Sequence, residues 1–267
     1  NHTFTASYNG QTKSTTVTVN NAETTAEIVL GDSQSNTDYD FSLVEEVVQI
    51  AAGGSHSAAV TKDGNLYMWG YNYHGELGVY TSENKNAPIL VNNSTTALPA
   101  KSVKSVALGS EHSAAITKDG SLYMWGHNNF GQLGDGTNTN RYVPVKIMDN
   151  VVSVSLGSEH SAIITKGGSL YMWGCNYAGE LGDGTNTNRY TPVKIMDNVA
   201  SVSLGNYHSA AITKDGSLYM WGMNDFGQLG DGTSLDKSKP TKIMDDVVSV
   251  SLGGYHSAAI TKDGNLY

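Results

Sequence analysis

Hydrophobic and polar positions alternate along this chain in short runs separated by turns, and the same order of runs returns several times. In 151–157, VVSVSLG, branched apolar residues alternate with small polar residues, which is the period-two pattern of a β-strand. HSAIIT (160–165) and SLYMWG (169–174) follow as two more apolar runs, separated by a Lys-Gly-Gly turn at 166–168. PVKIM (192–196) begins with a proline, which suits an edge strand. Each group of runs therefore predicts four short antiparallel strands.

This group recurs with a period of 48 residues after a first spacing of 56. The string LYMWG places tryptophans at Trp69, Trp125, Trp173 and Trp221. The string His-Ser-Ala places histidines at His56, His112, His160, His208 and His256. Residues 103–150 and 151–198 are identical at 39 of 48 positions, so the units are close copies.

The units cover 47–102, 103–150, 151–198 and 199–246, with part of a fifth at 247–267. Four-stranded sheets repeated in this way are typical of a β-propeller. The sequence predicts an all-β fold with four full blades and a partial fifth in an open arc.

The recurring string G-x-x-H-S-A-A-I-T-K-D-G-x-L-Y-x-W-G-x-N-x-x-G-Q-L-G resembles the repeat of the regulator of chromosome condensation family, in a bacterial version. The resemblance covers 47–267 and implies seven-bladed propellers that bind proteins. Roughly two and a half blades would then be missing from this chain. The family's founding member exchanges guanine nucleotide on a small GTPase and binds chromatin, but no motif in this sequence indicates either role.

The first 46 residues carry a different pattern. Two alternating runs around Asn9-Gly10, within 2–19, predict a β-hairpin. It is similar to the last strands of bacterial immunoglobulin-like surface modules, so 1–20 is interpreted as the end of such a module. Residues 21–46 are polar and acidic, which indicates a linker, with Ile28–Leu30 as a candidate edge strand. We expect a fragment of a longer bacterial protein, secreted or on the cell surface, whose signal and anchor lie outside this sequence.

Composition and charge narrow the functional classes. The chain has 16 Lys and Arg against 25 Asp and Glu, a formal charge of −9, which argues against a nucleic-acid partner. No apolar run is long enough for a membrane span. The single cysteine, Cys175, excludes an internal disulfide and is interpreted as a loop residue without redox function. We predict no catalytic residue, no cofactor and no metal.

The repeated residues that could carry chemistry have simpler structural interpretations. We expect each repeat histidine to bond to the backbone of the next blade and each repeat tryptophan to fill the space between blades. The loop segment Leu-Gly-Asp-Gly-Thr-Asn-Thr-Asn, at 133–140 and 181–188, has Thr137 and Thr139 where a calcium loop needs carboxylates or amides. We expect Asp135 to form an Asx turn instead.

The near-identical repeat units differ mainly on one face of the predicted fold. This face carries the turn before each repeat histidine and the loop after each Trp-Gly pair. Aromatic and amide side chains on such loops are typical of recognition surfaces, although drift in slack loops would produce differences too. The candidate partner-binding residues are Tyr71, Tyr73, His74, Glu111, His127, Asn129, Glu159, Tyr177, Tyr207, Asp225 and Tyr255. Phe130 and Phe226 could instead fold inward as loop anchors.

Charge differs between the two faces. The face with the differing loops also carries acidic residues, namely Glu111, Glu159, Asp135, Asp183, Asp225 and Asp231. Lys118, Lys214 and Lys262 lie in the opposite turns. An acidic face would steer basic partners toward it.

The sequence therefore predicts a non-catalytic protein-interaction module. A carbohydrate-binding propeller and a purely structural spacer within an adhesin remain as alternatives. We also expect the open arc to self-associate through its exposed blade edges.

Overall fold

The computed structural model describes residues 2–8, 11–17, 46–93 and 95–267. Strands β1 (His2–Tyr8) and β2 (Gln11–Val17) pair antiparallel, with His2 opposite Val17, which confirms the predicted hairpin. The Asn9-Gly10 turn, the linker up to residue 45 and the candidate strand Ile28–Leu30 lie outside the described residues. Within the described part of the chain, no helix is long and apolar enough to span a membrane.

The repeat units form four complete sheets and a partial fifth, as predicted. The first sheet contains β3 (Val47–Ala52), β4 (His56–Thr61), β5 (Leu66–Gly70) and β6 (Lys85–Leu90). The second contains β7 (Val103–Leu108), β8 (His112–Thr117), β9 (Leu122–Gly126) and β10 (Arg141–Met148). The third contains β11 (Val151–Leu156), β12 (His160–Thr165), β13 (Leu170–Gly174) and β14 (Arg189–Met196). The fourth contains β15 (Val199–Leu204), β16 (His208–Thr213), β17 (Leu218–Gly222) and β18 (Lys237–Met244), and the fifth contains β19 (Val247–Leu252) and β20 (Ser257–Thr261).

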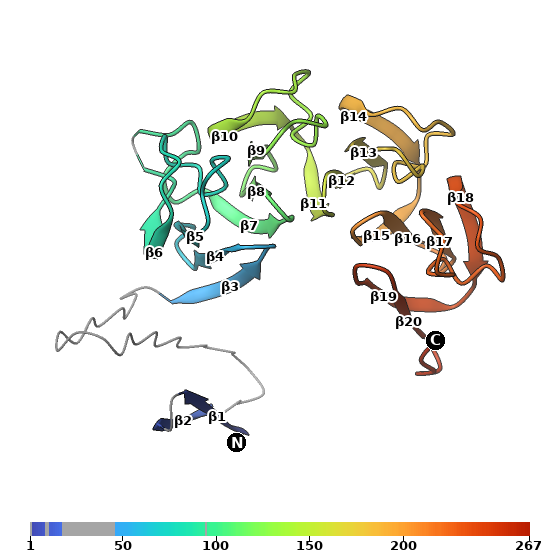
Figure 1. Cartoon of the computed structure of the whole chain (residues 1–267), viewed down its shortest axis with the longest axis horizontal. Coiled ribbons are helices and arrows are strands. Elements are labelled where there is room, and N and C mark those ends of the chain that lie inside the picture. The colour runs from blue at the N-terminus through green and yellow to red at the C-terminus, as the bar shows by residue number, and fades with distance from the viewer. Residues whose placement is uncertain (1, 9–10, 18–45, 94) are drawn as a thin grey trace.

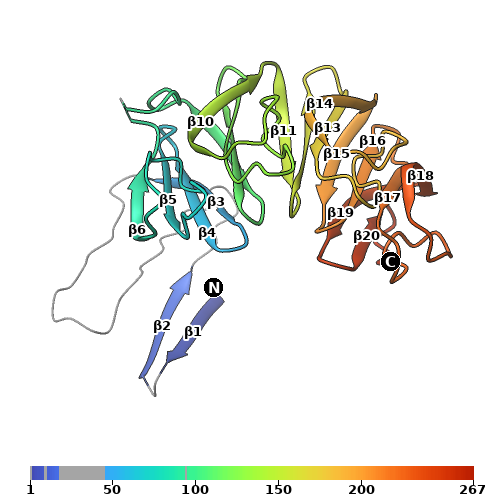
Figure 2. The same cartoon turned by 45° about the horizontal axis from the view of Figure 1, so that its top comes forward.

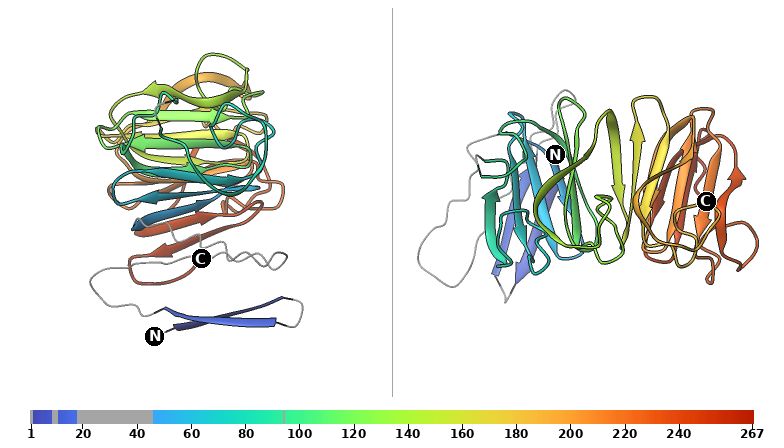
Figure 3. Two further views of the ribbon diagram at one scale, coloured as in Figure 1. Left: turned by 90° about the vertical axis from the view of Figure 1, so that its left-hand side faces the viewer. Right: turned by 90° about the horizontal axis from the view of Figure 1, so that it is seen from above.

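The sheets stand side by side along an open arc, like blades of an incomplete propeller (Figure 1). The first strands of the sheets, β3, β7, β11, β15 and β19, lie on the inner side of the arc, and β6, β10, β14 and β18 lie on its outer side (Figure 1). Figure 2 and the right-hand view of Figure 3 show the successive sheets packed face to face. The inner strands β7, β11, β15 and β19 each contact the first and second strands of the preceding sheet.

Strand bounds follow the hydrophobic pattern closely, except in the outer strands. β14 begins at Arg189, three residues before the Pro192 that opens the predicted run. Its pairing with β13 shifts register on both sides of the Tyr171–Lys194 and Met172–Val193 pairs, which lets an edge strand with a proline stay paired. The sequence analysis placed the start too late because polar residues at an exposed edge carry no period-two signal.

The hydrophobic core consists of four clusters, each formed between two neighbouring sheets. In the first, Leu66 and Met68 of one sheet pack with Val103 and Trp125 of the next. Trp125, Trp173 and Trp221 are fully buried and pack in the clusters between neighbouring sheets. Trp69 is only half-buried, because no described sheet precedes it. Stability is therefore shared between sheets, as in other repeat proteins.

Candidate interaction surface on the loop face

A repeated hydrogen-bond relay joins each blade to the next. The Nε2 atom of His56 lies 2.9 Å from the Ser113 hydroxyl of the following sheet, and that hydroxyl donates to the backbone carbonyl of Glu76 at 2.8 Å. Trp125 donates its indole N–H to the same carbonyl at 2.7 Å. The equivalent relays are His112–Ser161–Gln132–Trp173 and His160–Ser209–Glu180–Trp221, with His208–Ser257–Gln228 toward the partial blade.

The relay corrects one expectation about the histidines. They bond to the serine side chain of the next blade, and the backbone bond that we expected is made by that serine. Because the Ser113 proton is donated to a carbonyl, His56 must donate its Nε2 hydrogen to Ser113, which leaves Nδ1 unprotonated. Burial lowers the pKa of His56 to about 4 and that of His112 to about 3, so both rings are neutral at pH 7. Their role is structural.

A buried asparagine organises each loop that follows a Trp-Gly pair. The Asn128 side chain accepts from the Leu133 amide at 2.9 Å and donates to the Thr137 and Thr139 carbonyls at 3.1 Å. Asn72, Asn176 and Asn224 make equivalent bonds. This role was not predicted, although the same Asn recurs in all four loops among neighbours that differ, which is the signal that could have revealed it. These bonds hold the exposed loop residues on a fixed backbone.

The Asp residues of the same loops are neutralised within them. Asp135 accepts from the Thr137 amide at 3.0 Å, which confirms the expected Asx turn, and pairs with Arg141. Asp183 pairs with Arg189 and Asp231 with Lys237 in the same way. These three carboxylates therefore add no net charge to the loop face, which is less acidic than the sequence analysis expected.

We use "loop face" for the surface formed by the turn between the first and second strands of each sheet and the loop between its third and fourth strands. The backbone brings the two differing positions of each unit together, because the His127 amide donates to the Glu111 carbonyl at 2.9 Å. In the same way, the Cys175 amide donates to the Glu159 carbonyl and the Met223 amide donates to the Tyr207 carbonyl, both at 2.9 Å. Positions that are 16 residues apart in sequence thus become neighbours.

A third position at which the units differ lies in the preceding blade, and its side chain contacts this pair. His74 of the first unit lies against His127 of the second, with ring centroids 4.6 Å apart. The Glu111 carboxylate lies 3.7 Å from both His74 Nε2 and His127 Nδ1. At the far end of the arc, Phe226 takes the place of His74 and packs on Tyr255 at 5.4 Å. The polar contact at the first interface is therefore replaced by an aromatic contact at the last one.

Aromatic rings link these positions into a row. Its members are Tyr71, Tyr73, His74, His127, Phe130 and Tyr177, with successive ring centroids 6.5, 5.0, 4.6, 6.4 and 5.9 Å apart. We call this set the aromatic row. A second group is formed by Tyr207, Tyr255 and Phe226. Both lie on the loop face, so the structure brings most of the candidate residues into two groups.

The candidate residues differ in how far their side chains are exposed to solvent. Tyr73 and Tyr177 are 64% and 66% exposed, and Tyr255 is 48% exposed. Asn129 and Asp225 are exposed as well, whereas Tyr71, His74, Glu111, Glu159 and Tyr207 are half-buried. His127 is buried and accepts a hydrogen bond from Gln132, so its side chain does not fit the expectation of an exposed contact. Phe130 is half-buried between its neighbours, whereas Phe226 is 70% exposed and is not an inward anchor.

Buried Cys175 and half-buried Glu159 lie side by side in the third unit, and burial shifts the pKa of both. Burial raises the pKa of the Cys175 thiol to about 12, so a reactive thiolate does not form at pH 7. Burial also raises the pKa of Glu159, with Glu111 adding to the shift. Cys175 is a buried residue of the loop that follows β13, which is the position expected from the sequence.

The opposite face is built from the repeated Lys-Asp-Gly turns. Lys118 reaches the neighbouring unit and donates to the Asp63 and Lys101 carbonyls at 2.7 and 3.0 Å. Asp119 bonds its own turn through Thr117 and Ser121. In this turn the Lys118 side chain therefore serves a contact between blades and the Asp119 side chain a contact within one.

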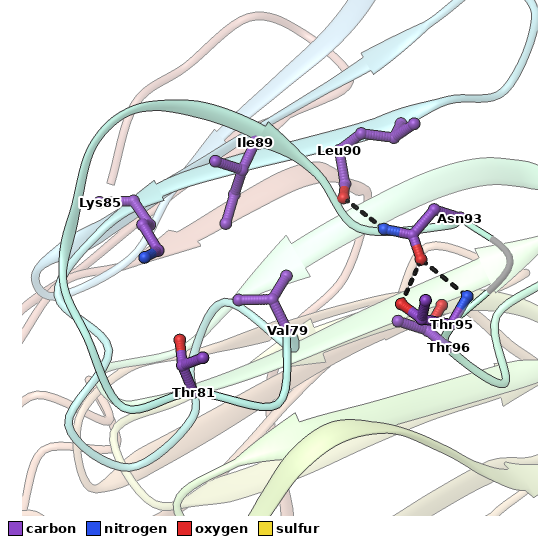
Figure 4. Close-up of a pocket in the computed structure, with 8 residues that line it drawn as sticks. All are labelled: Val79, Thr81, Lys85, Ile89, Leu90, Asn93, Thr95 and Thr96. Atoms are coloured by element: carbon purple, nitrogen blue, oxygen red, sulfur yellow. Dashed lines mark hydrogen bonds between the residues drawn. The ribbon is translucent and has the colours of Figure 1, made fainter.

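A small cavity lies beside β6, the outer strand of the first unit. It has a volume of about 250 Å³ and is bounded by the extra residues of the first unit, including Val79, Ile89 and Thr96 (Figure 4). Asn93 closes one end by donating to the Leu90 carbonyl at 3.1 Å (Figure 4). Its charged lining residue, Lys85, is already paired with Glu83 at 3.1 Å. Asn93, Thr95 and Thr96 hydrogen-bond within their own segment, so these polar side chains of the lining serve the local fold.

Comparison with known proteins gives one family and several partial relatives. A family model described as an RCC1-like domain matches residues 12–267. The ultraviolet-B receptor UVR8 of Arabidopsis thaliana is 43% identical over 101 residues, which is 38% of this chain and 22% of UVR8. The human E3 ubiquitin-protein ligase HERC2 is 39% identical over 109 residues, or 40% of this chain and 2% of HERC2.

Solved structures show the same architecture. Human WBSCR16 matches with a TM-score of 0.74 at 27% identity, over 82% of this chain and 59% of that one. Prp20p of Saccharomyces cerevisiae, studied for its binding to Gsp1p and histones, matches with a TM-score of 0.71 at 28% identity, over 81% of this chain and 56% of that one. The chain thus spans less than two thirds of each of these relatives.

Proposed function

The chain belongs to the RCC1-like domain family, and on that premise we propose that it is a non-catalytic module that binds a protein partner through its loop face. The observation that carries the proposal is the aromatic row. Its exposed members, Tyr73 and Tyr177, stand on loops that are fixed by buried asparagines. Rigidly held tyrosines give a large contact area with little loss of side-chain entropy on binding.

Relatives support a protein as the ligand class. Yeast Prp20 has been studied for its binding to Gsp1p and histones and has been crystallised bound to Kap60. Those partners belong to Prp20. For this chain we propose only the class of ligand and the face that binds it.

Charge on the loop face favours a partner with basic and apolar groups. Glu111 and Asp225 carry no ion pair with Lys or Arg among the described residues, whereas Asp135, Asp183 and Asp231 are neutralised. A basic side chain of the partner would gain a carboxylate partner here without displacing one. Apolar partner groups would cover the neighbouring rings of the aromatic row.

The proposal is tested with a ligand selected on the intact chain from a displayed protein library. We expect the double variant Tyr73→Ala with Tyr177→Ala to bind this ligand at least about tenfold more weakly, as loss of interface tyrosines does elsewhere. The control Lys214→Ala lies on the opposite face and should bind like wild type. Loss of binding in the control but not in the double variant would contradict the proposal.

A carbohydrate ligand is the second candidate, because the Tyr207 and Tyr255 rings pair at 5.9 Å on the loop face and offer surfaces on which sugars stack. A glycan array separates the two candidates. Specific glycan binding that is lost in the double variant Tyr207→Ala with Tyr255→Ala would favour the carbohydrate and contradict a protein ligand. A spacer role would be favoured if neither glycans nor proteins bind.

We further propose that the module acts outside the cell, in a bacterial protein with immunoglobulin-like modules. The proposal rests on the sequence of the N-terminal hairpin. Protease treatment of intact cells that express the complete reading frame tests it. Cleavage of the module supports the proposal, and full protection contradicts it.

A further inference from the structure

We propose that His74, Glu111 and His127 form a binding site for a divalent cation of the zinc class at the interface between the first and second blades. Glu111 Oε2 lies 3.7 Å from His74 Nε2 and 3.7 Å from His127 Nδ1. One ligand atom from each residue lies within 4.8 Å of the other two. The site shares His74 and His127 with the aromatic row, but the inference rests on the geometry of these three side chains and not on the proposed protein partner.

The distribution of histidines singles this site out. Of the eight histidines, five occupy the repeat position and His2 lies in the N-terminal hairpin. The remaining two, His74 and His127, come from different units and meet at the same carboxylate. At the position of His74 the other units have Phe130, Ala178 and Phe226, and at the position of His127 they have Tyr71, Cys175 and Met223. The imidazoles are therefore not needed for the blade fold.

Two of the three ligand distances are near those of a tetrahedral site. Zinc bonds of about 2.0–2.2 Å place tetrahedral ligands about 3.3–3.6 Å apart, so the two 3.7 Å distances to Glu111 need to shorten by only a few tenths of an ångström. The ligand nitrogens of His74 and His127 lie within 4.8 Å of each other and have to approach by up to about 1.5 Å, which a turn of the half-buried His74 ring would supply. Glu111 and His127 are held next to each other by the backbone bond between them, and His74 stands on the Asn72 loop. Three protein ligands would leave a fourth position for water.

The local charge favours a cation. Among the described residues, Glu111 has no lysine or arginine partner, and its ion-pair contacts are the two imidazoles. Glu76 is fully buried beside the site, and its Oε1 atom has no hydrogen-bond partner. A bound cation would compensate both carboxylates.

Binding would exchange two existing hydrogen bonds for metal bonds. Gln132 now donates to His127 Nδ1 at 2.9 Å, and Asn140 donates to His74 Nδ1 at 3.1 Å. Coordination of His127 through Nδ1 displaces the Gln132 amide. Coordination of His74 through Nε2 moves its ring proton to Nδ1, which ends the Asn140 bond. We therefore expect weaker affinity than in preformed structural zinc sites.

The types of ligand atom also determine which metals the site would bind. Imidazoles with one carboxylate suit zinc, cobalt, nickel and copper, whereas calcium and magnesium prefer sites made of oxygen ligands. We expect zinc and cobalt to bind and calcium not to bind.

Calorimetric titration of the full chain with zinc chloride tests the proposal, with cobalt absorption as a second readout. The chain supplies substitutions that its own fold tolerates, namely His74→Phe, Glu111→Tyr and His127→Met, each taken from the same position in another unit. Each is expected to weaken zinc binding at least about tenfold while the far-UV circular dichroism stays unchanged. His256→Gln is the matched control, because this exposed histidine lies at the other end of the arc.

Binding at one equivalent, with a tetrahedral cobalt spectrum that is lost in the three variants and kept in His256→Gln, supports the site. The proposal is overturned if no zinc binds up to about 1 mM, or if the three variants bind it as wild type does. Zinc binding should also raise the thermal midpoint of wild type but not that of His127→Met, because the cation joins two blades.

Discussion

The layer between blades and the loop face are built from neighbouring residues, yet they differ in how they vary. Between blades, the His–Ser–carbonyl–Trp relay is the same at three interfaces, with bonds of 2.7–3.0 Å. On the loop face, the corresponding positions change from His and Glu to Phe and Tyr along the arc. The relay residues between blades, which we call the constant layer, hold the blades together. The differing residues of the loop face, which we call the varied layer, are free to serve recognition.

Residues next to each other in sequence can lie in different layers, because the side chain of a turn residue points to the loop face while that of the following strand residue points between blades. Glu111 reaches the surface beside His74, whereas His112 and Ser113 are buried between blades. A substitution at one position therefore leaves the other layer intact. The following tests use matched positions in the two layers, beginning with the largest expected effect.

Acidification should weaken the constant layer at every interface. Burial lowers the pKa of His112 and His160 to about 3 and of His56 and His208 to about 4, against about 6.5 in the unfolded chain. Between these values the unfolded chain binds more protons, so stability is present above pH 6.5 and is lost as the pH falls below it. Four such groups should remove about 5 kcal/mol per pH unit near pH 5.5, measured by urea unfolding.

The variant His112→Gln provides the control for this pH dependence, since its amide keeps the donor to Ser161 but does not titrate. The slope of stability with pH should fall by about a quarter. The raised pKa values of Glu76 and Glu180 act in the opposite direction in both proteins, so the difference between the two slopes is informative. Equal slopes would show that these histidines do not hold the blades.

Trp173→Ala should produce the next largest loss. Its fully buried ring fills the space between the second and third blades and donates to Gln132 at 2.9 Å, so about 3–5 kcal/mol of stability should disappear. Trp69→Ala is the matched comparison, because Trp69 is only half-buried at the first sheet and should lose clearly less. Chemical denaturation measures both, and equal losses would contradict a core located between blades.

Ser161→Ala should cost about 1–3 kcal/mol, because it leaves the His112 Nε2 hydrogen buried without an acceptor. Ser57 occupies the same repeat position in the first unit, where no described blade precedes it, and Ser57→Ala should change stability by less than about 0.5 kcal/mol. The two midpoints in urea can be compared directly. A large effect at Ser57 would mean that the serine acts within its own sheet.

Tyr177→Ala should have the smallest effect on stability, below about 0.5 kcal/mol, because its ring is 66% exposed. Tyr177 and Trp173 lie four residues apart in the same unit, so this pair contrasts the two layers directly. A loss of several kcal/mol in Tyr177→Ala, measured by the same unfolding assay, would place the aromatic row in the core.

The blades could be predicted from sequence because each is encoded several times. The unit boundaries at 47, 103, 151, 199 and 247 coincide with the first residues of β3, β7, β11, β15 and β19. The burial of Trp125, Trp173 and Trp221 followed from their period and size. The start of the outer strands did not follow, since exposed edge residues such as Arg189 carry no alternating pattern.

The side-chain groups on the loop face were harder to predict from sequence, because each group is formed by residues of two or more units. The loop face could be deduced from where copies differ, but the contact between His74 and His127 depends on how two blades stack. The burial of His127 depends on Gln132 and its neighbours, which the aromatic character of the loop does not reveal. The pairing of Asp135 with Arg141 likewise changes the charge of the face in a way that counting acidic residues misses.

Hydrogen–deuterium exchange of the full chain, with and without a protein ligand selected on it, tests the central claim most directly. Our account predicts slower exchange on binding in the loop-face segments 71–78, 109–112, 127–134 and 175–182, and no change in the Lys-Asp-Gly turns at 118–120 and 214–216. Protection confined to those opposite turns, with the loop-face segments unchanged, would contradict it.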